Sequence, residues 1–192
     1  MNAYVMAGGL AVRLRPLTEN FPKCLLSVSG VPILEIWLKA LLKTKEFDDI
    51  YVNVHHCSNH LKEWISAFNK VNDCEIRIID ETDALLGTAG TLYWHGDTVK
   101  DFLVIYSDTY SAGFFKQLKE LTVFWKQNPD KPLAGLVTFP IPDDSSAGAI
   151  ETDAMGNVVS FSEKSDKGLV AWAGIAFARR DFFDHIDRYD KD

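Results

Sequence analysis

The first turn of the chain gathers residue types that bind phosphate. Residues 6–32 read "MAGGLAVRLRPLTENFPKCLLSVSGVP" and follow the short apolar segment "MNAYV". Gly8 and Gly9 come directly after this segment, and the cations Arg13 and Lys23 follow. A glycine-rich turn after a strand brings backbone N–H groups close to phosphate oxygens. The glycines alone fit an ordinary tight turn equally well, so the phosphate hypothesis depends on the rest of the stretch.

Two well-known phosphate-binding patterns do not match this turn. The P-loop requires G-K-[ST] after four spacer residues, and the dinucleotide-binding fingerprint requires G-x-G-x-x-G. The sequence "GGLAVR" satisfies neither pattern. The turn therefore indicates a phosphate site of another kind.

Composition narrows the class of protein. With 192 residues, of which 47% are hydrophobic, the chain is predicted to form one globular domain with a full core. A net charge of −7 argues against nucleic-acid binding, which needs a broad basic face. No apolar run approaches the roughly 18–20 residues of a membrane span, and no secretory signal is recognisable. The three cysteines are interpreted as reduced thiols, and we expect a cytoplasmic protein with no membrane or nucleic-acid partner.

Short apolar runs alternate with helical patterns through the first 140 residues. Strands are predicted at 3–6, 50–54, 75–79, 102–108 and 133–139, and helices at 32–44, 58–69 and 114–128, with a short helix after Gly87. Ser58 is the expected N-cap of the second helix. This order predicts an α/β, Rossmann-like fold: a mostly parallel sheet flanked by helices on both faces. Ligands of such sheets bind beyond the carboxyl ends of the strands.

The pattern changes after residue 140. Residues 147–164 read as a β-hairpin with its turn at 155–157, residues 169–178 as a buried strand, and residues from 179 as the start of a helix. We expect this part to form a small region beside the main sheet.

The opening stretch resembles that of the sugar-1-phosphate nucleotidyltransferases, the nucleotide-sugar pyrophosphorylases. Their opening reads A-G-G-x-G-T-R-L-x-P-L-T, then P-K, then G-x-P; here it reads "AGGLAVRLRPLT", then "FPKCLLSVSGVP". The resemblance extends from residue 3 to about 186 and implies a GT-A-like nucleotidyltransferase domain. It implies that the loop amides of Ala7, Gly8, Gly9 and Leu10 hold the β and γ phosphates of a nucleoside triphosphate. Arg13 would then bind the leaving pyrophosphate, and Lys23 the α-phosphate.

Two further segments resemble nucleotide-binding and metal-binding signatures of this family. "LLGTAGTL" resembles L-G-T-A-G-x-L, which implies that Leu86, Gly87, Thr88 and Gly90 contact the nucleobase and ribose. Glu81, just before it, would read the edge of the base. "VIYSD" resembles the strand that ends in G-D, which implies that Asp108 binds Mg²⁺.

The resemblance also implies a sugar-phosphate site in the second half of the chain. "SSAGAI", "FSEK" and "VAWAGIAFA" resemble the family's sugar-site strands. The implied sugar-phosphate-binding residues are Gly148, Glu163, Lys164, Trp172, Ala173 and Gly174. Trp172 stands where the family has an asparagine that reads the sugar.

The implied reaction is transfer of a nucleotidyl group from an NTP to a sugar 1-phosphate, giving an NDP-sugar and pyrophosphate. Because the chain resembles the mannose- and heptose-1-phosphate guanylyltransferases, GTP is the first nucleotide that we expect. Formation of a homo-oligomer is left as an open alternative. Ala11, Val12 and Trp172 depart from the family pattern, and the family's C-terminal segment with a second metal-binding aspartate is not recognisable in the 192 residues. These departures favour a rival hypothesis: a nucleotide-sugar-binding regulatory subunit or sensor without full activity.

One cluster of possible metal ligands stands apart from these segments. Residues 54–60 read "VHHCSNH", and histidine and cysteine are common zinc ligands. No second pair of ligands follows at the spacing of a zinc finger. Turn packing and helix capping are therefore the preferred interpretation.

Overall fold

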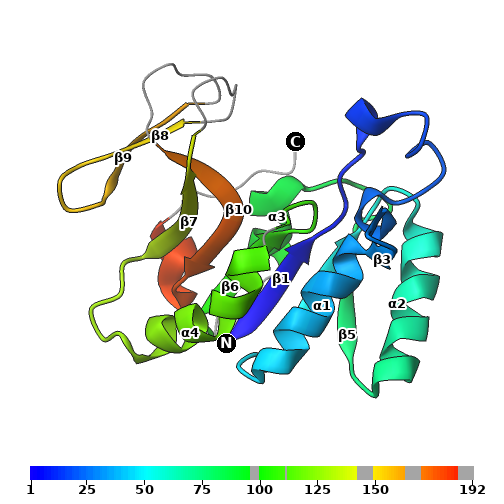
Figure 1. Cartoon of the computed structure of the whole chain (residues 1–192), viewed down its shortest axis with the longest axis horizontal. Coiled ribbons are helices and arrows are strands. Elements are labelled where there is room, and N and C mark those ends of the chain that lie inside the picture. Colours follow the sequence, from blue (N-terminus) through cyan, green and yellow to red (C-terminus); the bar gives the residue numbers. More distant parts are fainter. Residues whose placement is uncertain (96–99, 111, 142–148, 163–169, 186–192) are drawn as a thin grey trace.

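A mixed β-sheet forms the centre of the protein, whose computed structural model describes residues 1–95, 100–110, 112–141, 149–162 and 170–185 (Figure 1). The strands of this sheet are β1 (Asn2–Met6), β4 (Ile50–Val54), β5 (Ile76–Asp80), β6 (Phe102–Tyr106), β7 (Ala134–Pro140), β8 (Ala149–Thr152), β9 (Val158–Ser162) and β10 (Val170–Ala178). Their order is β5-β4-β1-β6-β10-β8-β9, and β7 also pairs with β10. The short strands β2 (Ser27–Val28) and β3 (Val31–Pro32) form a separate hairpin.

The helices lie close to their predicted positions. They are α1 (Ile33–Thr44), α2 (Ser58–Asn72), α3 (Gly87–His95) and α4 (Ala112–Gln127), with 3-10 turns η1 (Val12–Leu14), η2 (Lys23–Leu25) and η3 (Arg180–His185). The predicted capping role of Ser58 is wrong. Ser58 is the first helical residue, and the N-cap is Cys57, which has a left-handed backbone (φ 52°) and no side-chain capping bond.

The two halves of the sheet differ in strand direction. β1 pairs in parallel with β4 and with β6, and β4 pairs in parallel with β5. β10 runs antiparallel to β6, β7 and β8, and the β8–β9 hairpin projects away from α1 and α2 (Figure 1). The Rossmann-like half and the hairpin region are thus both confirmed.

Side chains alternate between two cores because successive strand residues face opposite sides of a sheet. Ala3 and Val5 pack into the core covered by α1, α2 and α4, whereas Tyr4 and Met6 pack into the core covered by α3 and η3. Helices therefore cover both faces of the sheet, as predicted. None of the helices in the described ranges is long and apolar enough to cross a membrane.

β1 is the point at which the order of the parallel strands reverses. β4 lies on one side of β1 and β6 lies on the other, so the connections that leave their carboxyl ends diverge. Open α/β sheets bind ligands in the crevice at such a switch point. The glycine-rich turn leaves β1 at this place.

Candidate nucleotide-binding site

A pocket of about 290 Å³ lies at the carboxyl ends of β1 and β6. Its walls come from the loop after β1, from η2, from the end of β4, from the start of α3 and from the segment after β6. The lining residues are Met6, Ala7, Gly8, Gly9, Ala11, Lys23, Cys24, Asn53, Leu85, Gly87, Thr88, Tyr106, Ser107 and Asp108. Segments that are far apart in the sequence, and that resemble separate family signatures, therefore meet in one pocket.

The loop after β1 is closed by its own backbone and by Thr18. Ala11 adopts a left-handed backbone (φ 49°, ψ 37°), which is the conformation for which glycine is best suited. The hydroxyl of Thr18, which is fully buried, donates a hydrogen bond to the carbonyl of Ala11 at 2.8 Å. Alanine is thus accommodated at some cost in backbone strain, about 1–2 kcal/mol. Val12 follows with 55% of its side chain exposed.

Asn53, at the end of β4, supports the start of this loop. Its Oδ1 accepts hydrogen bonds from the backbone N–H groups of Ala7 at 2.6 Å and of Gly8 at 3.1 Å. A Cβ added at Gly8 would lie 3.0 Å from Asn53 Nδ2, so glycine permits this close approach. A Cβ added at Gly9 would meet nothing within 4 Å. In this structure, two of the predicted phosphate-binding amides therefore face Asn53.

Lys23 and Asp108 meet across the pocket. Lys23 Nζ lies 2.6 Å from Asp108 Oδ2, with 37% and 45% of the two side chains exposed. Asp108 follows β6, and Ser107 N–H extends the pairing with β1 by donating to Met6 O at 3.1 Å. The indole of Trp37 donates to the carbonyl of Thr109 at 2.8 Å. The carboxylate is therefore held at a defined place beside the loop.

The start of α3 forms another wall. Gly87 has a positive φ of 69°, and the hydroxyls of Thr88 and Tyr106 share a hydrogen bond of 2.8 Å. Leu86 and Gly90 belong to the same segment, and Gly90 is buried. Gly87 and Thr88 thus line the pocket, and the contact of this segment with a nucleobase and ribose stays a prediction.

Glu81 lies beneath the site and is not part of the pocket's lining. Only 3% of the residue is exposed, and both carboxyl oxygens have internal partners. Asn53 Nδ2 donates to Oε2 at 3.1 Å, and the Thr91 hydroxyl donates to Oε1. Its predicted contact with the base edge stays untested, and this burial argues for a different role.

Only part of the predicted sugar-phosphate site can be placed. Gly148, Glu163 and Lys164 lie outside the described residues. The Trp172 ring lies 5.0 Å from that of Tyr106, and its indole N–H donates to Ile175 O at 2.9 Å.

The next two predicted sugar-site residues contact the segment that carries Asp108. The carbonyl of Ala173 accepts a hydrogen bond from Thr109 Oγ1 at 3.0 Å. A Cβ at Gly174, whose φ is 71°, would lie 2.9 Å from the same hydroxyl oxygen. The expected sugar-site strand therefore lies beside the segment that lines the switch-point pocket.

Arg13 is the predicted catalytic residue that the structure does not bring to the pocket. It lies on η1, is exposed, and is not among the lining residues. Conversely, the pocket includes Asn53 and Tyr106, which the sequence analysis missed. An asparagine within the otherwise apolar strand "IYVNV" was the available signal for Asn53.

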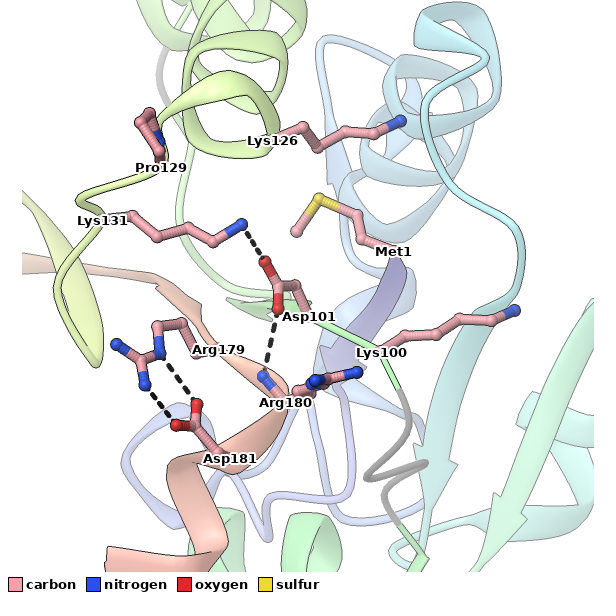
Figure 2. Close-up of a pocket in the computed structure, with 9 residues that line it drawn as sticks. All are labelled: Met1, Lys100, Asp101, Lys126, Pro129, Lys131, Arg179, Arg180 and Asp181. Carbon is pink, nitrogen blue, oxygen red and sulfur yellow. Dashed lines mark hydrogen bonds and ion pairs between the residues drawn. The ribbon is translucent and has the colours of Figure 1, made fainter.

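A larger pocket of about 620 Å³ lies at the opposite end of the strands, where β1 and β6 begin (Figure 2). Two of its cations are paired with acids inside the pocket: Lys131 with Asp101, and Arg179 with Asp181. Partial burial alone would raise the pKa of Asp101, but hydrogen bonds from Lys131 and the Arg180 N–H hold that pKa below its ordinary value.

The end of a helix borders this second pocket and suits part of its positive charge. α4 ends beside it, and the carboxyl end of a helix favours positive charge. None of the residues predicted to do chemistry lines it. The pocket at the switch point is therefore the candidate site.

The histidine-rich segment packs a turn. His55 Nδ1 lies 2.7 Å from Glu81 O, and His56 Nε2 lies 2.7 Å from Thr18 O. Within the described ranges, no group of three or more His, Cys, Asp or Glu residues is arranged to hold a metal ion. The three cysteines are unpaired, and burial raises the pKa of the Cys24 thiol to about 12.

Comparison with known proteins identifies the class. The model of the nucleotidyl transferase family matches residues 2–186, so the chain belongs to this family. It is 28% identical over 176 residues to a UTP–glucose-1-phosphate uridylyltransferase of Synechocystis (85% of this chain, 44% of the relative). It is 30% identical over 133 residues to the mannose-1-phosphate guanylyltransferase regulatory subunit alpha of Dictyostelium discoideum (66% of this chain, 31% of the relative).

A solved structure supports the fold. HddC from Yersinia pseudotuberculosis, in a crystal complex with GMP-PN, aligns with a TM-score of 0.73 and 21% identity, over 97% of this chain and 80% of that chain. The chain spans about half the length of the curated relatives it matches.

Proposed function

We propose that this chain carries the nucleotidyl-transfer site for making a nucleotide-sugar from an NTP and a sugar 1-phosphate. The observation that carries the proposal is the meeting of the loop after β1, Lys23 and Asp108 in one pocket at the switch point. A phosphate oxygen of the sugar attacks the α-phosphorus. The bond between the α-phosphorus and the bridging oxygen to the β-phosphorus breaks, and pyrophosphate leaves.

The chain's own residues position and neutralise charge. The loop amides from Gly9 onward bind the triphosphate, and Lys23 balances negative charge that builds on the α-phosphate. Arg13 lies on the exposed turn η1, so it reaches the departing pyrophosphate only if that turn moves toward the pocket.

The donor set at the pocket fits Mg²⁺. Mg²⁺ is commonly held by one or two carboxylates together with substrate phosphates and water, and Asp108 supplies one such carboxylate at the pocket wall. Asp108 would hold the ion, whose positive charge would lower the repulsion between the triphosphate and the incoming sugar phosphate.

GTP is the first nucleotide to test. The HddC crystal is a complex with GMP-PN, and one relative carries the name of a guanylyltransferase subunit, whereas another is a uridylyltransferase. Mannose and heptose 1-phosphates are the first sugars to test. The three unpaired cysteines suit the proposed cytoplasmic location.

A regulatory or sensing role is the second candidate. Ala11 in a strained backbone, Val12 without a hydroxyl and Trp172 in place of a sugar-reading amide all favour it, as does the name of the Dictyostelium relative.

Release of pyrophosphate separates the two roles. The chain is incubated with each NTP, a panel of sugar 1-phosphates and Mg²⁺, and pyrophosphate is measured by a pyrophosphatase-coupled phosphate assay. Pyrophosphate release with any pair of substrates supports the enzyme, provided that Lys23→Ala abolishes the release and Lys39→Ala does not. Lys39 is a matched control because it also forms an exposed ion pair of 2.6 Å, with Glu35. NTP binding without release for every pair supports the sensor and contradicts the enzyme.

A further inference from the structure

A buried network of hydrogen bonds joins two of the segments that line the proposed nucleotide pocket. It begins at the N–H groups of Ala7 and Gly8, passes through the Asn53 amide and the Glu81 carboxyl group, and ends at Thr91 on α3. The residues whose side chains form this network, Asn53, Glu81 and Thr91, are 5%, 3% and 0% exposed. Groups this deeply buried must satisfy their hydrogen-bonding capacity internally.

The position of each member follows from the sheet. β4 lies beside β1 in parallel, with Val5 opposite Val52, so Asn53 reaches the residues that follow β1. β5 lies on the other side of β4, and Glu81 continues that pairing because its N–H donates to Val54 O at 2.9 Å. Three neighbouring segments thus end at the same level, beneath the loop.

The orientation of the Asn53 amide is fixed by its partners. Two backbone N–H groups face one end of the amide, and only an oxygen accepts from both. The NH₂ end must therefore face Glu81, whose carboxyl oxygen accepts. An aspartate at this position would place two carboxyl groups against each other.

We infer that Asn53 and Glu81 are positioning residues that set the shape of the nucleotide-binding loop and tie it to the start of α3. The expected effect of these residues on nucleotide binding rests on the proposed function. Thr91 Oγ1 also lies 2.8 Å from Gly87 O, so the network ends at the turn that borders the pocket. Glu81 acts from beneath the loop, through Asn53, and contacts no ligand.

An isosteric exchange tests the inference. Asn53→Asp alone places two carboxyl groups in contact and should weaken binding of a non-hydrolysable GTP analogue with Mg²⁺ by about tenfold or more. Glu81→Gln alone keeps an acceptor for Asn53 and should bind within about twofold of the wild type. The double variant Asn53→Asp/Glu81→Gln restores complementarity with the donor direction reversed, so affinity should recover.

Asn69 provides a matched control. It is partly buried, and both ends of its amide form hydrogen bonds: Nδ2 donates to Ile76 O at 3.1 Å, and Oδ1 accepts from Ile76 N–H at 2.9 Å. Asn69→Asp should lower the melting temperature without changing nucleotide affinity. Equal loss of affinity in the Asn69 and Asn53 variants would overturn the inference.

A second readout is independent of nucleotide. Amide hydrogen exchange, resolved by NMR, should show protected N–H groups at Ala7 and Gly8 that lose protection in Asn53→Asp and regain it in the double variant. No change in their exchange would overturn the inference even if nucleotide binding fell. Conversely, a wild type that binds no NTP contradicts the proposed function, whereas the exchange result still decides whether Asn53 positions the loop.

Discussion

Lys23 Nζ and Asp108 Oδ2 lie 2.6 Å apart at the carboxyl ends of β1 and β6. The resemblance assigns both residues to a nucleotide, one to its α-phosphate and the other to its metal ion. An exposed ion pair contributes only about 0–1 kcal/mol, so a nucleotide that binds here with its cation would separate the pair at little cost.

Removing Lys23 should therefore affect turnover far more than folding. Lys23→Ala should bind the nucleotide only a few-fold more weakly but lose about 10²–10³ in turnover, because a donor aimed at developing charge is lost. Its melting temperature should match that of the wild type. Unchanged turnover would remove Lys23 from the mechanism.

Asp108→Asn separates metal binding from the ion pair. The amide still accepts a hydrogen bond from Lys23 but is a weaker ligand for Mg²⁺ than a carboxylate. We expect the Mg²⁺ concentration for half-maximal pyrophosphate release to rise about tenfold or more. An unaltered Mg²⁺ titration would place the metal ion elsewhere.

The two glycines after β1 should respond differently to alanine. Gly8→Ala should destabilise the protein, because the added Cβ would lie 3.0 Å from Asn53 Nδ2. Gly9→Ala should leave stability unchanged, because its Cβ would meet no atom within 4 Å. It should nevertheless weaken nucleotide binding by about tenfold, because the phosphates are proposed to approach the backbone at this residue. Thermal melts and equilibrium binding of both variants test this contrast. Equal behaviour of the two variants in both assays would contradict it.

Ala11→Gly should stabilise the chain. Ala11 has a left-handed backbone, and relief of that strain is worth about 1–2 kcal/mol, of which glycine's greater freedom in the unfolded chain cancels about 0.5–1 kcal/mol. We expect a gain of up to about 1 kcal/mol in urea unfolding. A less stable variant would mean that the strain at this position is relieved by other contacts.

Acid should weaken the contact between α2 and β5. A hydrogen bond from Lys62, followed by bonds from Thr82, lowers the pKa of Asp80 from its ordinary value of 3.8 to about 2. A lowered folded-state pKa gives stability that is present above about pH 4 and is lost as the pH falls toward 2. The difference in unfolding free energy between wild type and Lys62→Met should therefore shrink over this range. Lys70→Met, an exposed control on the same helix, should show no such trend, and a difference that grows on acidification would contradict the assignment.

The periodicity of the sequence was sufficient for most of the fold. The continuous apolar run "AYVM" predicted β1, which is buried on both faces of the sheet, and the apolar spacing of residues 33–44 predicted α1, which buries one face. Ser58 was misassigned because the cap depends on the backbone of Cys57, which residue type does not reveal.

Short motifs were sufficient to select residues that meet in one pocket, whereas contacts between side chains that are distant in the sequence were not foreseeable. Lys23 and Asp108 were expected from local signatures, and the structure brings them together. The support of the loop by Asn53 was not foreseeable, because it depends on β4 pairing beside β1. Contact with the base edge was predicted for Glu81 because it lies just before a segment that resembles a nucleotide-binding signature. Its burial depends on tertiary packing, which that signature does not reveal.

A crystal structure with a nucleoside triphosphate and Mg²⁺ bound would show whether the switch-point pocket holds the triphosphate. We expect phosphate density against the backbone of Gly9 and Leu10, with the Lys23–Asp108 pair opened toward it. Density in the pocket beside Arg180, at the far edge of the sheet, with the switch-point pocket empty, would contradict the account.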